Sequence, residues 1–260
     1  MKSRSVTTKK LYIIGAGPKA VAIAAKAAVL QSLGYTVPDV TIVEKHEIGA
    51  HWVGRFGYTD GRLLLATAPY KDMGFPYDSR LVLDRSHRRK IDEKMLQRFS
   101  WYAFNIDGQM GRYAAELDRG GMLEATEKGH RQPTHGEYAQ YLKWVAQRAN
   151  ADIRYAEVLE VESSRGKWRL ACQQNDGSSL ILDGGDGLVI TSPGDPIKLR
   201  VIESETNHGL EAHARILDGK SVWLKLLELA SAIENEEMPI CIIGSGETAA
   251  SVILSLSLNF

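Results

Sequence analysis

A glycine-rich motif near the amino terminus constrains the fold of this chain more than any other feature. Residues 15–20 read Gly-Ala-Gly-Pro-Lys-Ala, which fits the pattern G-x-G-x-x-A. Residues 11–14, directly before the motif, form a continuous apolar run that is typical of a strand buried on both faces. Residues 18–33 are rich in Ala, Val and Ile and predict a helix, which Gly34 is well placed to end. This order predicts the start of a βαβ unit.

Each small residue of the motif has a physical role in a turn that binds a dinucleotide. Gly15 permits the tight turn, Gly17 lets the backbone approach a pyrophosphate, and Ala20 lets the helix pack closely on the strand. Pro18 lies in the first helical turn, where its missing N–H costs no hydrogen bond. The free N–H groups at the helix start attract phosphate. We therefore expect these four residues to contact a cofactor, with a plain βα turn as the structural alternative.

A second predicted strand ends at an acidic residue. Residues 40–43 are a short apolar and β-branched run, and Glu44 follows them directly. Because a right-handed crossover makes this strand a parallel neighbour of the first, Glu44 is expected at the same sheet edge as the glycine motif. Its carboxylate can accept hydrogen bonds from ribose hydroxyl groups. Glu44 follows Gly15 by 29 residues, more than the usual spacing of about 20, so the intervening helix or loop must be extended.

The same pattern occurs again near the end of the chain. Gly244, Gly246 and Ala249 repeat the glycine motif 229 residues later, again after an apolar run at residues 240–243. That run predicts another strand, and the three small residues are candidates for contact with a second dinucleotide. The strand, glycine turn and helix therefore occur twice.

The residues between the two motifs predict an antiparallel meander. Three strand-like segments lie near residues 156–162, 168–173 and 179–182, separated by Ser-Arg-Gly and Asn-Asp-Gly turns. A fourth apolar run, 188–191, follows them. This order predicts an α/β fold of three layers, Rossmann-like and built for two dinucleotides, with FAD in one domain and NAD(P)H in an inserted second one.

Charge and cysteine content exclude several other classes. Lys plus Arg and Asp plus Glu each number 32, so no net field draws the chain to nucleic acid or to an anionic membrane. Cys172 and Cys241 are 69 residues apart without a C-x-x-C motif, which excludes a redox dithiol and a cysteine zinc site built from nearby residues. We expect no metal, two reduced core thiols and a cytoplasmic location. The apolar run 11–30 is interrupted by Lys19 and Lys26, so no membrane span is expected.

Other segments carry weaker signals. Residues 45–90 are expected to be rich in loops, and the basic run 85–90 is expected to be a solvated turn. Residues 134–137 have the spacing of a capping box and predict the start of an amphipathic helix. A further helix is expected at about 221–235.

Several longer motifs together resemble one known family. The chain resembles the flavin-dependent N-hydroxylating monooxygenases of siderophore biosynthesis, and among them most resembles the mycobactin-type lysine N6-monooxygenases. The resemblance rests on GAGPKAVAIAAKAAVL (15–30), His51-Trp52, TDG (59–61), PYKDMGFPY (69–77), PTHGEYAQYLKW (133–144), TSPG (191–194) and IIGSGETAAS (242–251). These motifs are spread over nearly the whole chain.

The resemblance implies an enzyme that uses FAD, NADPH and O₂ to hydroxylate the side-chain amine of L-lysine, or of a close relative such as ornithine or acyl-lysine. It implies that Lys71 binds the carboxylate of the amino acid and that Trp52 lies beside the flavin ring, while no catalytic residue is assigned. Ornithine-type members carry a Gln five residues before that Lys, where this chain has Ala66. Relatives also suggest a homo-oligomer.

The expected domain division follows from the same resemblance. Residues 1–200 are expected to be the amino-terminal part of an FAD-binding domain, and 201–260 the start of an inserted NADPH-binding domain. Only 14 residues follow Gly246, whereas a βαβ unit needs about 30, so a chain truncated at its carboxyl end is expected. The alternatives are a truncated inactive flavoprotein or partner surface, and a different flavin monooxygenase or oxidase.

Overall fold

A computed structural model describes residues 8–56, 59–65, 72–74, 85–106, 133–191, 217–219, 221–225 and 240–259. These residues fall into two compact units. The sheet unit comprises the described residues within 1–50, 65–133 and 137–192. The carboxy-terminal unit comprises those within 51–64, 134–136 and 193–260.

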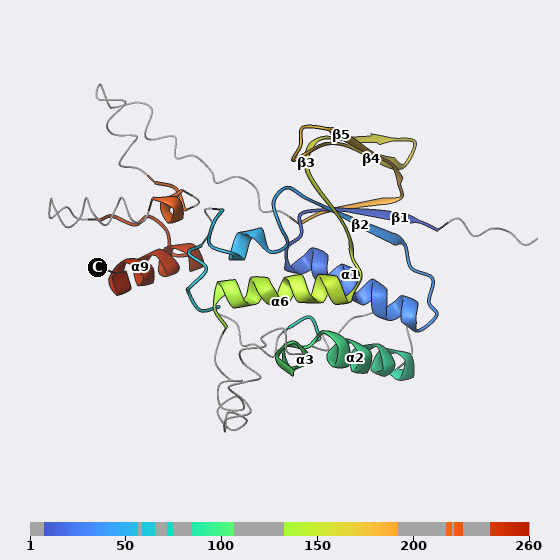
Figure 1. The fold of residues 1–260 in the computed structure, drawn as a ribbon, viewed down its shortest axis with the longest axis horizontal. Helices are drawn as coiled ribbons and strands as arrows, with labels where there is room; N and C mark the ends of the chain where they lie inside the picture. The colour runs from blue at the N-terminus through green and yellow to red at the C-terminus, as the bar shows by residue number, and fades with distance from the viewer. Residues whose placement is uncertain are drawn as a thin grey trace, which may run out of the picture. The chain divides into compact units, whose positions relative to one another are not determined.

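The described elements follow the α/β order that the sequence predicts. They are β1 (Lys10–Ile14), α1 (Pro18–Ser32), β2 (Asp39–Glu44), η1 (Ala50–Trp52), α2 (Arg85–Phe99), α3 (Trp101–Ile106), α6 (His135–Arg148), β3 (Asp152–Ser164), β4 (Lys167–Gln174), β5 (Ser179–Gly185), β6 (Gly187–Ile190), η4 (Val222–Leu224) and α9 (Glu247–Asn259). In Figure 1, α1 and α6 lie on one side of the parallel strands, and the β3–β5 meander lies on the other. The expected three layers are therefore present in the sheet unit.

The sheet has the strand order β5-β4-β3-β2-β1-β6. β1 is parallel to β2 and to β6, and β2 is parallel to β3, whereas β3, β4 and β5 pair in antiparallel fashion. Both the βαβ unit and the meander are confirmed. β1 lies between β2 and β6, so the glycine turn that follows it has a neighbouring strand on each side.

β3 is a single long strand that belongs to both parts of the sheet. Its first residues pair with β2, ending with Tyr155 opposite Glu44. From Ala156 onward it pairs with β4, with a register shift between Val158 and Glu160. Such a bulge increases the local twist, which lets the meander turn away from the parallel strands.

Helix α1 packs through small residues. Its buried positions are Ala20, Val21, Ala24, Ala25 and Val29, a stripe with the spacing of one helical face. Alanine side chains let the helix axis approach the sheet closely. The helix ends as expected, because Gly34 adopts φ +83° and donates its N–H to Gln31 O at 3.0 Å.

Two apolar layers flank the parallel strands. Ile13 and Ile42 are fully buried, while their strand neighbours Tyr12 and Val43 belong to the cluster on the opposite face. That second cluster also holds Ala156, Leu170 and Cys172. Because both faces of β1 and β2 are covered, their sequences are continuous apolar runs rather than alternating ones.

Helices α3 and α6 are joined by aromatic contacts. The rings of Phe104 and Tyr141 lie 5.6 Å apart, and those of Phe104 and Trp144 lie 5.5 Å apart, distances typical of edge-to-face packing. The Tyr141 hydroxyl donates to Phe99 O and accepts the Met73 N–H at 2.9 Å. These contacts fix α6 within the sheet unit.

Three expectations from the sequence were wrong. Residues 85–90 are the first turns of α2 rather than a solvated turn, because Ile91, Met95 and Phe99 give this helix a buried face. Cys172 is buried as expected, but Cys241 is exposed. Residues 240–243 form no strand, since no partner strand for them occurs among the described residues of the carboxy-terminal unit.

The carboxy-terminal unit has a small core of its own. Leu63, Val222, Trp223 and Val252 are buried together there. Of the helix expected at about 221–235, the structure describes the short η4 at Val222–Leu224, and residues 226–239 lie outside the described part.

Within the described part of the chain, no helix combines the length and the apolar character that crossing a bilayer requires.

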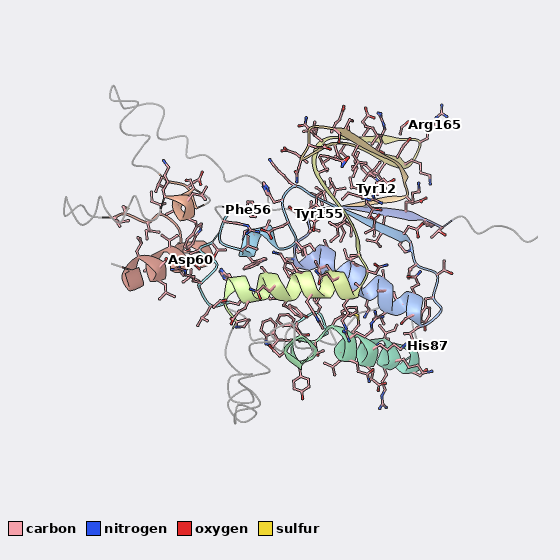
Figure 2. The ribbon with its side chains drawn as sticks, in the orientation of Figure 1. Tyr12, Phe56, Asp60, His87, Tyr155 and Arg165 are labelled. Atoms are coloured by element: carbon pink, nitrogen blue, oxygen red, sulfur yellow. The ribbon has the colours of Figure 1, made fainter. Side chains whose placement is uncertain are left out.

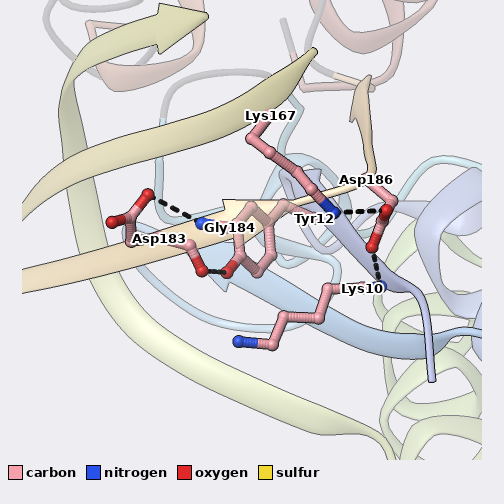
Figure 3. A network of polar contacts seen from close by, with 6 residues as sticks. All are labelled: Lys10, Tyr12, Lys167, Asp183, Gly184 and Asp186. Carbon is pink, nitrogen blue, oxygen red and sulfur yellow. Dashed lines mark hydrogen bonds and ion pairs between the residues drawn. The ribbon is translucent and has the colours of Figure 1, made fainter. Parts of the chain in front are cut away.

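A polar network fastens β1 to the turn between β5 and β6 (Figure 3). Asp186 accepts the backbone N–H of Lys10 at 2.9 Å and pairs with Lys167 Nζ at 2.6 Å. Nearby, the Tyr12 hydroxyl donates to Asp183 O at 2.6 Å. The ring of Tyr12 lies where a side chain at Gly185 would be, 2.6 Å from an added Cβ, so only glycine fits at that position.

We expect the Asp186→Asn variant to be less stable than the wild type at pH 7. The hydrogen bond from Lys167, and then that from the Lys10 N–H, lower the pKa of Asp186. A lowered folded-state pKa adds stability above the unfolded value of about 3.9, and this is lost as the pH falls through the folded-state pKa. Urea unfolding at pH 7 and pH 3 should show a stability difference that shrinks in acid. A difference of equal size at both pH values contradicts the assignment.

Candidate functional site

The glycine turn after β1 forms the centre of the candidate site. Gly15 adopts φ +92°, a conformation that disfavours residues with a Cβ. Its N–H donates to Val43 O at 2.8 Å, which ties the turn to β2. Gly17 is the N-cap of α1, Pro18 begins the helix, and Ala20 is fully buried. The roles predicted for Gly15, Pro18 and Ala20 in shaping the turn agree with these positions.

Gly17 differs from Gly15, because neither its conformation nor any neighbour among the described residues requires a glycine there. Its φ is −80° and its ψ −175°, an extended conformation that any residue adopts. A Cβ added at Gly17 would meet no heavy atom within 4 Å. The position is therefore open in front of the helix N-terminus, where unpaired N–H groups favour an anion. A side chain at this position would occupy the open space that a pyrophosphate needs for a close approach to the backbone.

Glu44 braces the turn from the end of β2. Its side chain is buried, and its Oε2 atom accepts the Ala16 N–H at 2.7 Å while Oε1 accepts the His46 N–H at 2.9 Å. Each carboxylate oxygen has a second lone pair. Glu44 can therefore hold the loop and still accept hydrogen bonds from ribose hydroxyl groups, as the sequence predicts.

Thr191 braces the same turn from the end of β6. Its hydroxyl donates to Ile14 O at 2.9 Å and to Gly15 O at 3.1 Å, sharing one proton between them. Its backbone N–H also donates to Ile14 O, at 3.0 Å. Sequence reasoning singled out this residue only as part of the TSPG motif, because its partner lies 177 residues earlier.

Tyr155 of β3, the strand next to β2, lies beside Glu44 at the carboxyl end of β2. It is 44% exposed. Partial burial raises the pKa of its phenol, and the charges of Glu44 and Glu47 raise it further. Glu47 itself is paired with Lys143 of α6. The sequence alone did not identify Tyr155, since one tyrosine in a strand carries no distinguishing pattern.

Trp52 belongs to an aromatic and imidazole cluster in the carboxy-terminal unit. Its ring lies 5.0 Å from that of His51 and 5.0 Å from that of His135. The His135 Nδ1 atom is hydrogen-bonded to the hydroxyl of Thr59, at 2.5 Å, and both residues are buried. Burial lowers the pKa of His51, which favours the neutral imidazole. The predicted position of Trp52 beside a flavin stays a prediction.

The second glycine motif also forms a turn before a helix. Gly244 has φ +136°, and the Ala250 N–H donates to Gly246 O at 3.1 Å at the start of α9. A Cβ added at Gly246 would meet no heavy atom within 4 Å. Gly246 is therefore open in the same sense as Gly17, and Ala249 lies in the first turn of the helix.

Lys71 and Ala66 lie outside the described residues. The residue after Lys71 is described and is firmly held. Asp72 is buried, accepts the Gly74 N–H at 2.7 Å through Oδ1, and accepts the Trp101 N–H through Oδ2. The role of Lys71 at the amino acid carboxylate stays a prediction.

Comparison with known proteins links this geometry to nucleotide-binding enzymes. A family model described as FAD-NAD(P)-binding matches residues 12–192. The L-lysine N6-monooxygenase MbtG of Mycobacterium sp. (strain MCS) is 33% identical over 249 residues, which cover 96% of this chain and 50% of the relative. MbtG of Mycobacterium tuberculosis (strain ATCC 25618 / H37Rv) is 35% identical over 246 residues, covering 95% and 50%. The chain thus spans about half the length of these curated relatives.

A solved structure agrees with the sequence relatives. Lysine monooxygenase NbtG from Nocardia farcinica matches with a TM-score of 0.71 and 36% identity, over 95% of this chain and 56% of that chain. Ornithine hydroxylase PvdA from Pseudomonas aeruginosa matches in fold, with a TM-score of 0.59 and 20% identity, over 98% of this chain and 52% of that chain.

Substitution by alanine should change the stability of the chain differently at the two glycines of the first turn. Gly15→Ala is expected to destabilise the chain by about 1–2 kcal/mol, because a Cβ is strained at positive φ. Gly17→Ala should leave the melting temperature unchanged, since the conformation is ordinary and the Cβ meets open space. Thermal unfolding without added nucleotide, followed by circular dichroism, distinguishes the two. Equal destabilisation by both variants would contradict the interpretation that the glycine at position 17 serves a ligand rather than the fold.

Proposed function

The chain belongs to the FAD-NAD(P)-binding family, and we propose that it provides the FAD-binding part of a monooxygenase that hydroxylates the side-chain amine of L-lysine. One observation carries the proposal: Gly17, directly in front of the α1 N-terminus, has an ordinary conformation and no close neighbour among the described residues, so neither feature requires a glycine. A pyrophosphate is the group that such a turn accommodates. The relatives named L-lysine N6-monooxygenase support the choice of reaction.

In this proposal the residues of the first site contact different parts of FAD. Gly15, Gly17, Pro18 and Ala20 form the turn against the pyrophosphate, and Glu44 accepts the ribose hydroxyl groups. FAD, held there and reduced by NADPH, would supply the chemistry that activates O₂ for transfer of one oxygen atom to the amine. The protein must orient the amino acid and exclude water. We propose that Trp52 lies beside the flavin ring and that Lys71 binds the carboxylate of the substrate.

The second motif is proposed to contact the other nucleotide. Gly244, Gly246 and Ala249 would lie against NADPH, which supplies the electrons. The division into an FAD-binding domain at 1–200 and the start of an NADPH-binding domain at 201–260 is part of the same proposal. The chain covers about half the length of the named relatives, and the boundary near residue 200 follows from the family resemblance. Self-association into a homo-oligomer is proposed from the family resemblance, and a cytoplasmic location from the two cysteines, both of which are free thiols.

The purified chain should be yellow, and the Gly17→Val variant should lose its flavin. A branched side chain at position 17 fills the space that the pyrophosphate needs, while the extended conformation of Gly17 tolerates valine. Absorbance at flavin wavelengths, per mole of folded protein, measures the outcome. Gly246→Val is the matched control, because Gly246 is equally open but belongs to the second motif. A colourless wild type would instead support the inactive alternative.

The complete product of the gene that encodes this chain should form N6-hydroxylysine from lysine, NADPH and O₂. In that protein, Lys71→Ala should raise the KM for lysine about tenfold or more and leave the KM for NADPH unchanged, because the lost ammonium pairs only with the substrate carboxylate. Lys90→Ala, at an exposed lysine of α2, is the control. NADPH oxidation that yields only hydrogen peroxide with every amine would contradict the proposed reaction.

A further inference from the structure

Tyr155 lies on the same face of the sheet as Glu44. The two residues are direct partners in the parallel pairing of β2 and β3, and side chains of such partners point to the same face. Ala156, the next residue, points the other way and is buried in the cluster beneath the meander. Tyr155 is therefore on the face of the α1 N-terminus, at the level where β2 ends.

The ring of Tyr155 is exposed but not isolated. Lys45, the residue after Glu44, forms an ion pair of 2.8 Å with Glu157, which lies two residues after Tyr155 and therefore on the same face of β3. The charges of Glu44 and Glu47 reach its phenol and help to hold its pKa above the ordinary value. The phenol is therefore neutral at physiological pH. Figure 2 labels Tyr155, which emerges from β3 near the end of β2.

The order of strands matches the order of groups in an adenine dinucleotide. In the proposed function, the turn after β1 holds the pyrophosphate and Glu44 at the end of β2 accepts the ribose hydroxyl groups. The next strand is β3, about 4.8 Å further out. An adenine attached to that ribose would lie further out than Glu44, and the side chain that β3 presents at the level of Glu44 is the aromatic ring of Tyr155.

We infer that Tyr155 is the stacking platform for the adenine of the dinucleotide held by the glycine turn and Glu44. The inference rests on the proposed function, because it takes FAD as the occupant of this site. An exposed aromatic ring gives a purine a flat apolar surface on which it can stack. The face of the ring, rather than the hydroxyl group, carries the interaction.

The test measures the affinity of the whole chain for three ligands. Dissociation constants for FAD and FMN come from flavin fluorescence, and the constant for ADP comes from displacement of FAD. Tyr155→Thr removes the ring, and Tyr155→Phe keeps it. Tyr102→Thr is the control, because Tyr102 lies on α3 and is 72% exposed. Tyr155→Val is a second ring-deleting variant with a higher strand preference, used if the Thr variant melts early.

Tyr155→Thr should raise the dissociation constants for FAD and ADP about tenfold. The dissociation constant for FMN, which has no adenine, should stay unchanged. Tyr155→Phe should bind FAD within about threefold of the wild type, and the control should match the wild type. Three results would each overturn this inference and leave the proposed function standing. They are an unchanged affinity of Tyr155→Thr for FAD, an equal loss of FAD affinity in Tyr155→Phe and Tyr155→Thr, and a loss of FMN affinity in Tyr155→Thr as large as that for FAD. A wild-type chain that binds neither FAD nor ADP would overturn the proposed function as well.

Discussion

The glycine turn after β1 is held by the strands on both of its sides, and the candidate site depends on this support. From β2, Val43 O accepts the Gly15 N–H and Glu44 accepts the Ala16 N–H. From the other side, the Thr191 hydroxyl donates to the carbonyl groups of Ile14 and Gly15. These bonds occupy the backbone groups at the start of the turn and leave Gly17, the next glycine, facing open space. A rigid turn with one open position is preorganised for a ligand, because little conformational entropy remains to be lost on binding.

Much of the sheet unit could be predicted from the sequence, since its signals are local. The apolar runs, the glycine motif and the Gly-containing turns predicted β1, α1, β2 and the meander to within a few residues. What could not be predicted depends on partners remote in sequence. Thr191 and Tyr155 gain their positions from strand pairing. Residues 240–243 have the composition of a strand, but a strand needs a neighbour, and Ile243 is 79% exposed.

Charged and basic segments were predicted less well than apolar ones. The run at 85–90 suggested a turn because it carries four basic residues in six positions. The helix that forms there depends on Ile91, Met95 and Phe99, which follow the run and supply its buried face. The exposed Cys241 was misjudged in the same way, because its apolar neighbours suggested a buried strand that the described part of the chain does not contain. Local composition does not show whether a segment such as 85–90, or a side chain such as Cys241, is buried by other parts of the chain.

The pairing of β1 with β6 has a consequence for the newly made chain. Lys10 and Asp186, which join these strands, are 176 residues apart. At 5–20 residues per second, a ribosome needs about ten seconds or more to make the intervening segment. During that time one edge of an apolar strand, Leu11 to Ile14, has no partner, and such edges invite pairing with other chains. Binding of a chaperone to the nascent chain, or fast translation of the segment that precedes β6, would therefore reduce pairing with other chains.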